Sequence, residues 1–130
     1  MSQENVEALS HALAVAADRF DDFLAILDKD VVWDTGDQFP GGTVHGRDGV
    51  REFFRQWFGT FDDFRSETKE CIDAGSAVYT HVRQWGRGKG SGAAAQTDFW
   101  LAWLFFQGKV VRVTYFPTRD EALEAAGLSE

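Results

Sequence analysis

Residues 77–116 read AVYTHVRQWGRGKGSGAAAQTDFWLAWLFFQGKVVRVTYF, and the fold class follows most directly from their pattern. It is rich in the β-branched and aromatic residues that favour strands, interrupted by glycine-containing turns. One more extended run lies just before it. The predicted strands cover residues 64–72, 77–87, 94–106 and 109–116. Turn-forming residues separate them at 73–76, 86–92 and 107–108. The pattern therefore predicts a four-stranded antiparallel meander.

The residues before the meander predict three helices and one more strand. Val6, Leu9 and Leu13 recur at three- and four-residue spacing, which is typical of an amphipathic helix. Two further apolar stripes of this kind follow. The predicted helices cover residues 3–17, 20–27 and 48–58, with a strand at 31–33 and an irregular loop at 35–46. The sequence thus places three helices in its N-terminal half.

A fourth, short helix is predicted after the meander. Pro117 ends the last strand, and Thr118 with Glu121 three residues later forms the capping-box pattern, with Gly127 closing the helix. The order of elements predicts an α+β domain with helices on one face of a strongly bent sheet.

The composition limits the possible functions. A chain of 130 residues with 44% hydrophobic and 26% charged residues is predicted to form one globular domain. Five Trp and twelve Phe provide more ring surface than such a core needs, so some rings are expected to line a cavity or an interface. The net charge of −8 opposes binding to nucleic acid or to an anionic membrane surface.

Targeting signals and metal motifs are not recognisable in the sequence. The polar N-terminus and the lack of an apolar run of roughly 20 residues predict a cytoplasmic protein that does not enter a membrane. Cys71, the single cysteine, excludes an internal disulfide and is expected to be buried and inert. The three histidines lack metal-ligand spacing, and neither a metal nor a cofactor is expected.

Three segments, 27–34 (LDKDVVWD), 46–54 (GRDGVREFF) and 108–111 (GKVV), resemble the SnoaL-like branch of the nuclear transport factor 2-like superfamily, which includes the ketosteroid isomerases. The resemblance extends over nearly the whole chain and implies one domain over residues 1–130. It implies a cone-shaped, curved, mixed or antiparallel sheet wrapped on the three N-terminal-half helices, with the short C-terminal helix. Members commonly form homodimers through the outer sheet face.

The resemblance places Asp34 where ketosteroid isomerases hold their proton-shuttling carboxylate. Desolvation in an aromatic pocket raises the pKa of a carboxyl group and suits it to act as a general base. The alternative is a loop carboxylate that is hydrogen-bonded to Gly36 or to the turn beyond it. The oxyanion-hole Tyr and Asp of those enzymes correspond here to Ala12 and Leu101, so steroid isomerisation is not expected.

The same resemblance implies the remaining residues of a hydrophobic pocket. His81 could donate a hydrogen bond or shuttle a proton, and Arg83 could hold a carboxylate or enolate oxygen or simply pair with an acid. The expected catalytic residues are Asp34, His81 and Arg83. The resemblance gives as expected ligand-binding residues Tyr79, Trp85, Phe99, Leu101, Trp103 and Tyr115. Two more are expected from their own positions: Phe39 at the pocket rim, and Trp57, which either forms the pocket floor or belongs to the core.

The opposite parity of the strand at 94–106 is expected to face outward and to form a dimer contact. That set comprises Asp98, Trp100, Ala102 and Leu104. A β-bulge would exchange the two sets of side chains, because a slip by one residue moves every side chain to the other face. Trp33 is expected to pack beneath the helices or at an edge.

The segment 86–92 does not have the spacing of a phosphate-binding loop and reads as a flexible hairpin. Its cations, Arg87 and Lys89, could attract an anionic ligand or simply be solvated. Two functions stay open. The first is a cofactor-independent acid–base enzyme, of the isomerase, cyclase or dehydratase type, acting on an apolar carbonyl compound. The second is a non-catalytic module for hydrophobic-ligand binding or dimerisation.

Overall fold

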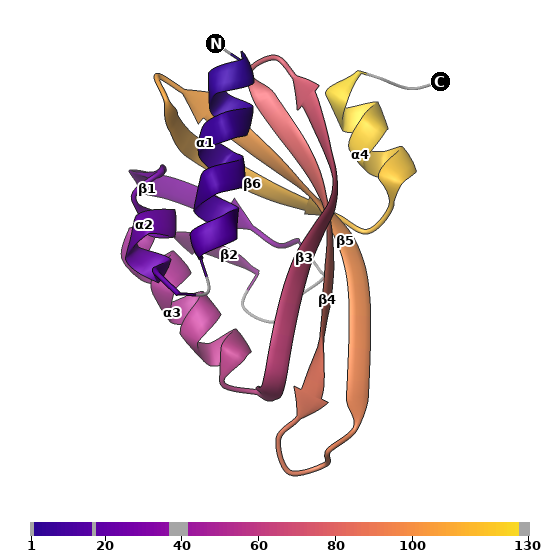
Figure 1. The fold of residues 1–130 in the computed structure, drawn as a ribbon. Coiled ribbons are helices and arrows are strands. Elements are labelled where there is room, and N and C mark those ends of the chain that lie inside the picture. Colours follow the sequence, from indigo (N-terminus) through magenta and orange to yellow (C-terminus); the bar gives the residue numbers. More distant parts are fainter. Residues whose placement is uncertain (1, 17, 37–41, 128–130) are drawn as a thin grey trace.

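The computed structural model describes residues 2–16, 18–36 and 42–127. Its body is a six-stranded mixed sheet with the order β2-β1-β6-β5-β4-β3, in which only β1 and β6 pair in parallel (Figure 1). The strands are β1 (Leu27–Asp34), β2 (Thr43–His45), β3 (Phe61–Ala74), β4 (Ala77–Gly88), β5 (Ala94–Phe106) and β6 (Lys109–Phe116). The predicted antiparallel meander is confirmed as β3 to β6.

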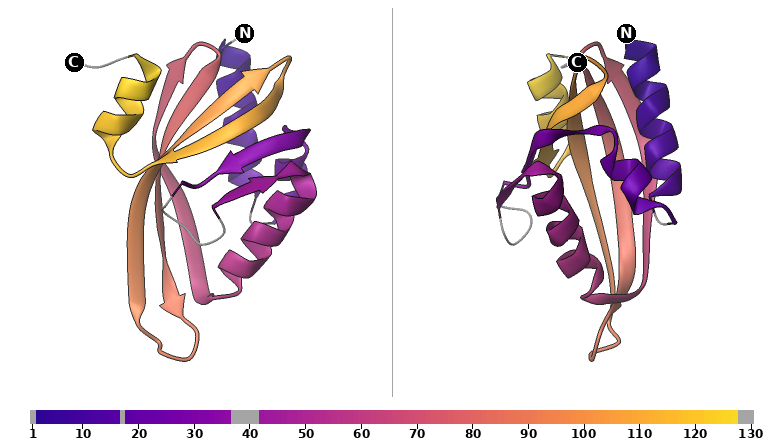
Figure 2. Two further views of the ribbon diagram at one scale, coloured as in Figure 1. Left: turned by 180° about the vertical axis from the view of Figure 1, so that it is seen from behind. Right: turned by 90° about the vertical axis from the view of Figure 1, so that its left-hand side faces the viewer.

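The helices lie on both sides of this sheet. Three of them, α1 (Ser2–Val15), α2 (Phe20–Leu24) and α3 (Gly46–Phe58), cover its inner, concave face, whereas α4 (Arg119–Ala126) packs on the outer face (Figure 2). The expectation that all helices share one face is therefore wrong for α4. Its apolar side packs at Ala122 against Tyr79 and Trp100, which point away from the main core. Burial of these two large rings accounts for the position of the helix.

The inner face carries an interlocked aromatic core. The Trp33 side chain is 1% exposed and meets Phe23, Phe54 and Trp103 edge-on, with centroid separations of 5.3 to 6.3 Å. Edge-to-face packing suits the quadrupoles of aromatic rings. Because Phe23 belongs to α2 and Phe54 to α3, the prediction that Trp33 packs beneath the helices is confirmed.

The C-terminal helix is capped as the sequence predicts. The backbone N–H of Glu121 donates to Thr118 Oγ1 over 3.2 Å, and Gly127 ends the helix in the left-handed conformation at φ +73°. Both contacts satisfy backbone groups that a helix end otherwise leaves unpaired.

Three local expectations need correction. The segment 35–46 contains β2, a short strand that pairs with β1 and so satisfies backbone groups of that edge. The strand expected to start at residue 64 starts at Phe61, and a bulge near Asp63 (φ +54°) lets it bend. Cys71 is exposed, because β3 is an edge strand with few buried side chains.

Across the described ranges, no helix is both long and apolar enough to cross a bilayer. The cytoplasmic location stays a prediction.

Candidate functional site

The register of β4 on β5 decides which side chains face the interior. Val82 lies opposite Phe99, and Thr80 lies opposite Leu101. Directly opposed residues of an antiparallel pair share a face. Since Phe99 and Leu101 are buried in the inner core, Val82 and Thr80 must point inward with them.

The expected orientation of β4 is therefore wrong by one residue. Four expected pocket residues lie on the outer face, opposite Ala102, Trp100, Asp98 and Gln96 of β5. These four are Tyr79, His81, Arg83 and Trp85. Tyr79 is buried under α4, and burial raises the pKa of its hydroxyl. The other three line an outer surface that α4 leaves open.

Asp34 also points outward, because Trp33 before it takes the inward position. Its Oδ2 accepts a 2.8 Å hydrogen bond from Arg112. Its Oδ1 accepts from the Gly36 N–H at 2.9 Å and from Thr43 Oγ1 at 3.3 Å. The expected alternative, a carboxylate hydrogen-bonded to Gly36, matches this geometry, and the expected orientation into the cone is wrong.

The three expected catalytic side chains do not meet. Two strands, β6 and β5, separate Asp34 on β1 from His81 and Arg83 on β4, a span of roughly 14 Å at the usual strand spacing. Arg83 instead donates from Nε to Asp98 Oδ1 at 2.8 Å, and His81 Nε2 lies 3.6 Å from the same oxygen.

His81, Arg83 and Asp98 form a cluster on the outer face, in which these side chains interact with one another. The hydrogen bond from Arg83, aided by its charge and by His81, holds the pKa of Asp98 below its ordinary value. The His81 ring stacks on Trp100 with centroids 5.2 Å apart and planes 9° from parallel. Arg83 was expected either to hold a ligand oxygen or to pair with an acid. The structure shows the second arrangement, a surface ion pair with Asp98.

Four expected wall residues do lie on the inner face, where they fill the core. They are Phe99, Leu101, Trp103 and Tyr115, all buried. Trp33 Nε1 donates to Tyr115 Oη over 3.0 Å, and Trp103 Nε1 donates to Thr80 Oγ1 over 2.9 Å. Burial raises the pKa of Tyr115 above its ordinary range, so its hydroxyl stays neutral.

Trp57 belongs to a second group of rings, where α3 meets β3. We call it the corner cluster; it comprises Trp57, Phe58, Phe61 and Phe64, with neighbouring centroids 4.9 to 5.7 Å apart. All four are partly exposed. Trp57 Nε1 donates to Gln84 Oε1 at 3.2 Å, and Gln84 points inward from β4. Phe39, the remaining expected ligand contact, lies outside the described residues.

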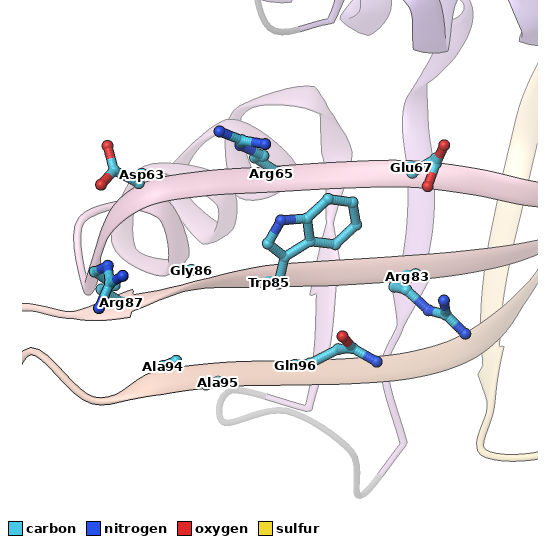
Figure 3. Close-up of a pocket in the computed structure, with 10 residues that line it drawn as sticks. All are labelled: Asp63, Arg65, Glu67, Arg83, Trp85, Gly86, Arg87, Ala94, Ala95 and Gln96. Carbon is cyan, nitrogen blue, oxygen red and sulfur yellow. The ribbon is translucent and has the colours of Figure 1, made fainter.

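A groove of about 720 Å³ opens on the outer face of β3, β4 and β5, beside the β4–β5 hairpin. Figure 3 shows the indole of Trp85 in its middle, with Arg65 and Glu67 on the β3 side and Gln96 on the β5 side. The full lining is Asp63, Arg65, Glu67, Arg83, Trp85, Gly86, Arg87, Ala94, Ala95 and Gln96. Sequence reasoning missed most of this set, because its members come together only through the strand register.

Within residues 2–16, 18–36 and 42–127, no three His, Cys, Asp or Glu side chains gather closely enough to hold a metal ion.

Comparison with known families fits this architecture. The family model described as a SnoaL-like domain matches residues 6–113. The chain belongs to the SnoaL-like family. The resemblance drawn from three short segments of sequence is thereby confirmed, as is the curved-sheet α+β fold that it implies. A search of curated proteins finds no match for this SnoaL-like chain.

Solved structures share the SnoaL-like fold at low sequence identity. An NTF2-like protein of unknown function from Burkholderia pseudomallei is 24% identical over 93% of this chain and 95% of its own, with a TM-score of 0.78. TerC, co-crystallised with polyporic acid, is 24% identical over 95% and 98%, with a TM-score of 0.75. A putative SnoaL-like polyketide cyclase from Jannaschia sp. CCS1 is 17% identical over 99% and 94%, with a TM-score of 0.72. Likeness at this level concerns the fold.

Proposed function

We propose that this SnoaL-like chain is a non-catalytic module that binds an apolar, ring-containing small molecule at the corner cluster. The observation that carries the proposal is a group of four partly exposed rings where α3 meets β3. Phe58 is 38% exposed, and it contacts Phe64 across the corner. An apolar ligand that covers these rings releases water from both surfaces, which favours binding.

Gln84 supplies a polar contact beside these rings. Its side chain is 9% exposed, and its Oε1 is occupied by Trp57 Nε1. Among the described residues no acceptor hydrogen-bonds to the Gln84 Nε2 group, and that atom is not sealed from solvent. A carbonyl oxygen on the ligand would accept from it, which favours a ring ketone or a similar compound.

The placement of the ionisable residues supports binding without proton transfer. Asp34 is engaged by Arg112, Gly36 and Thr43 on the outer side of β1. His81 and Arg83 share Asp98 on the outer side of β4. A general base must reach the proton that it removes, and none of these three groups lies on the face that carries the corner cluster. The presence of polyporic acid with TerC supports a binding role for this fold.

A ring ketone with exchangeable α-protons, 2-tetralone, tests binding and catalysis together. We expect 2-tetralone to shift the indole N–H resonance of Trp57 in NMR spectra in a saturable manner. Replacing Phe61 or Phe64 by alanine should weaken the affinity by about fivefold, since an aromatic contact contributes roughly 1 kcal/mol. Phe106→Ala, an exposed phenylalanine on β5, is the matched control and should bind as the wild type does.

The same samples in deuterated buffer report on catalysis. We expect the α-protons of 2-tetralone to exchange at the rate seen in buffer alone. Protein-dependent exchange that disappears in Asp34→Asn would contradict the non-catalytic assignment. A saturable shift that is unchanged in Phe61→Ala and Phe64→Ala would contradict the binding site.

We also propose that the chain forms a homodimer through the outer face of the sheet, near the end of β5. Leu104 and Phe106 are 38% and 63% exposed there. Two large apolar side chains on one exposed strand end are a typical part of an interface. In a two-fold dimer each copy would cover the same residues of the other.

Light scattering at high micromolar concentration tests the dimer. We expect a dimeric mass for the wild type and a monomeric mass for the double variant Leu104→Asp/Phe106→Asp, because a buried unpaired carboxylate opposes association. Phe58→Asp is the control and should stay dimeric, since Phe58 is as exposed as Leu104 but lies in the corner cluster. A monomeric wild type would contradict the proposal.

A further inference from the structure

The groove on the outer face is built from adjacent rows of side chains that cross three strands. One row consists of Arg65, Trp85 and Gln96, and the next consists of Glu67, Arg83 and Asp98. Arg87 lies two residues beyond Trp85 on β4 and is opposite Ala94. The Trp85 ring lies between β4 and β3 in this groove (Figure 3). The volume of about 720 Å³ lies within the range of small-molecule sites.

Some charged side chains of this groove are paired with a neighbour and others are not. Arg83 is neutralised by Asp98 at 2.8 Å, and Glu67 accepts from Lys69 at 3.2 Å. Within the part of the chain that the structure describes, neither the Arg65 nor the Arg87 side chain forms a hydrogen bond or an ion pair. Asp63 is the one acidic lining residue outside these pairs. Two unpaired guanidinium groups thus flank an indole, on a protein whose net charge is −8.

We propose that this groove is a second ligand site, separate from the corner cluster, which takes a flat aromatic carboxylate. The ring of the ligand stacks on Trp85, and its carboxylate accepts hydrogen bonds from Arg65 and Arg87. Guanidinium groups match a carboxylate in shape and charge, and the aromatic face of Trp favours a planar ring. The sequence indicates that Arg87, a cation of the hairpin, could attract an anionic ligand. The proposed site places that ligand in the groove.

The groove lies apart from the residues of the dimer contact proposed above. Gln96 and Leu104 are eight residues apart on β5, which corresponds to about 27 Å along an extended strand. A small anion is favoured over a second copy of the chain at this end because the groove is concave and its unpaired charge is mainly of one sign. Contact between two copies here would bring Arg65 and Arg87 toward their own equivalents.

Titration with 2-naphthoate, followed by the indole N–H resonance of Trp85, tests the site. Trp85→Phe identifies that resonance by its loss. We expect a saturable shift for 2-naphthoate, and much weaker effects from acetate and from the neutral analogue 2-naphthalenemethanol. Arg65→Gln and Arg87→Gln should each weaken binding by about tenfold, the effect of one charge-assisted hydrogen bond. Arg19→Gln, which removes the same charge from a surface pair with Asp22, should bind as the wild type does.

Four results of the titration would overturn the site. They are the absence of a saturable shift at Trp85, equal binding of the neutral analogue, unchanged affinity in the double variant Arg65→Gln/Arg87→Gln, and a shift at Trp57 in place of Trp85. The last result would assign 2-naphthoate to the corner cluster and leave that proposal intact. A monomeric mass for Trp85→Ala where the wild type is dimeric would show that a second copy covers the groove, and would also overturn the ligand site.

Discussion

Replacing Trp33 with alanine is expected to lower the free energy of unfolding by about 4 kcal/mol, the range for removing a large aromatic side chain from a packed core. Trp33 is 1% exposed and contacts rings from α2, α3 and β5. The substitution also removes the donor of the 3.0 Å hydrogen bond to Tyr115 Oη. A loss of this size is a large part of the stability of an ordinary domain.

Urea denaturation followed by far-UV circular dichroism measures this loss without relying on tryptophan fluorescence. Trp85→Ala is the matched control, because it deletes the same side chain from a partly exposed position on the outer face. We expect it to cost less than about 1.5 kcal/mol. Equal losses for the two variants would contradict the assignment of Trp33 to the core and of Trp85 to the surface.

The division between these two tryptophans illustrates what the sequence could predict. The strand that contains Trp33 followed from a short apolar run, a local pattern, and the structure places Trp33 in one of its two expected positions, beneath the helices. The meander and the cap at Thr118 were equally local, since strand and turn residues alternate over short distances. The resemblance to the SnoaL-like family added the cone shape, in which the curved sheet wraps on the three N-terminal-half helices.

The orientation of Trp85 could not be predicted in the same way. Both parities of β4 carry large side chains, so alternation does not distinguish the inner face from the outer one. The register with β5 does so, and it depends on a glycine-rich turn whose sequence does not specify a pairing. An error of one residue there moved His81, Arg83 and Trp85 together from the predicted pocket to the outer surface.

The outward position of Asp34 has a related cause. A strand of alternating orientation that buries Trp33 must direct Asp34 to the opposite face. The resemblance to ketosteroid isomerases suggested the inward orientation, although the neighbouring indole already had a stronger preference for the core. The corner cluster and the outer groove both depend on contacts between distant segments, so neither could be read from spacing along the chain.

Gly46→Ala is expected to destabilise the protein by about 2 kcal/mol, through the left-handed backbone that it would force on alanine and the contact that its Cβ would make. Gly46 has φ +75°, and a Cβ there would lie 3.2 Å from the backbone oxygen of Lys29. The next residue, Arg47, donates from Nε to the Leu27 carbonyl at 2.8 Å, so this segment holds the start of α3 against β1. Strain at Gly46 therefore acts where these two elements join.

Gly49→Ala, three residues later in the same helix, is expected to have the opposite effect on stability. A Cβ at Gly49 would lie 3.7 Å from Val44 Cβ, an ordinary contact, and its φ is not positive. Alanine stabilises a helix interior relative to glycine by about 0.5 to 1 kcal/mol, so this variant should be more stable than the wild type. Thermal and urea unfolding of the two variants measure the difference directly. If both variants changed the free energy of unfolding in the same direction, the left-handed backbone at Gly46 would not explain why glycine occupies that position.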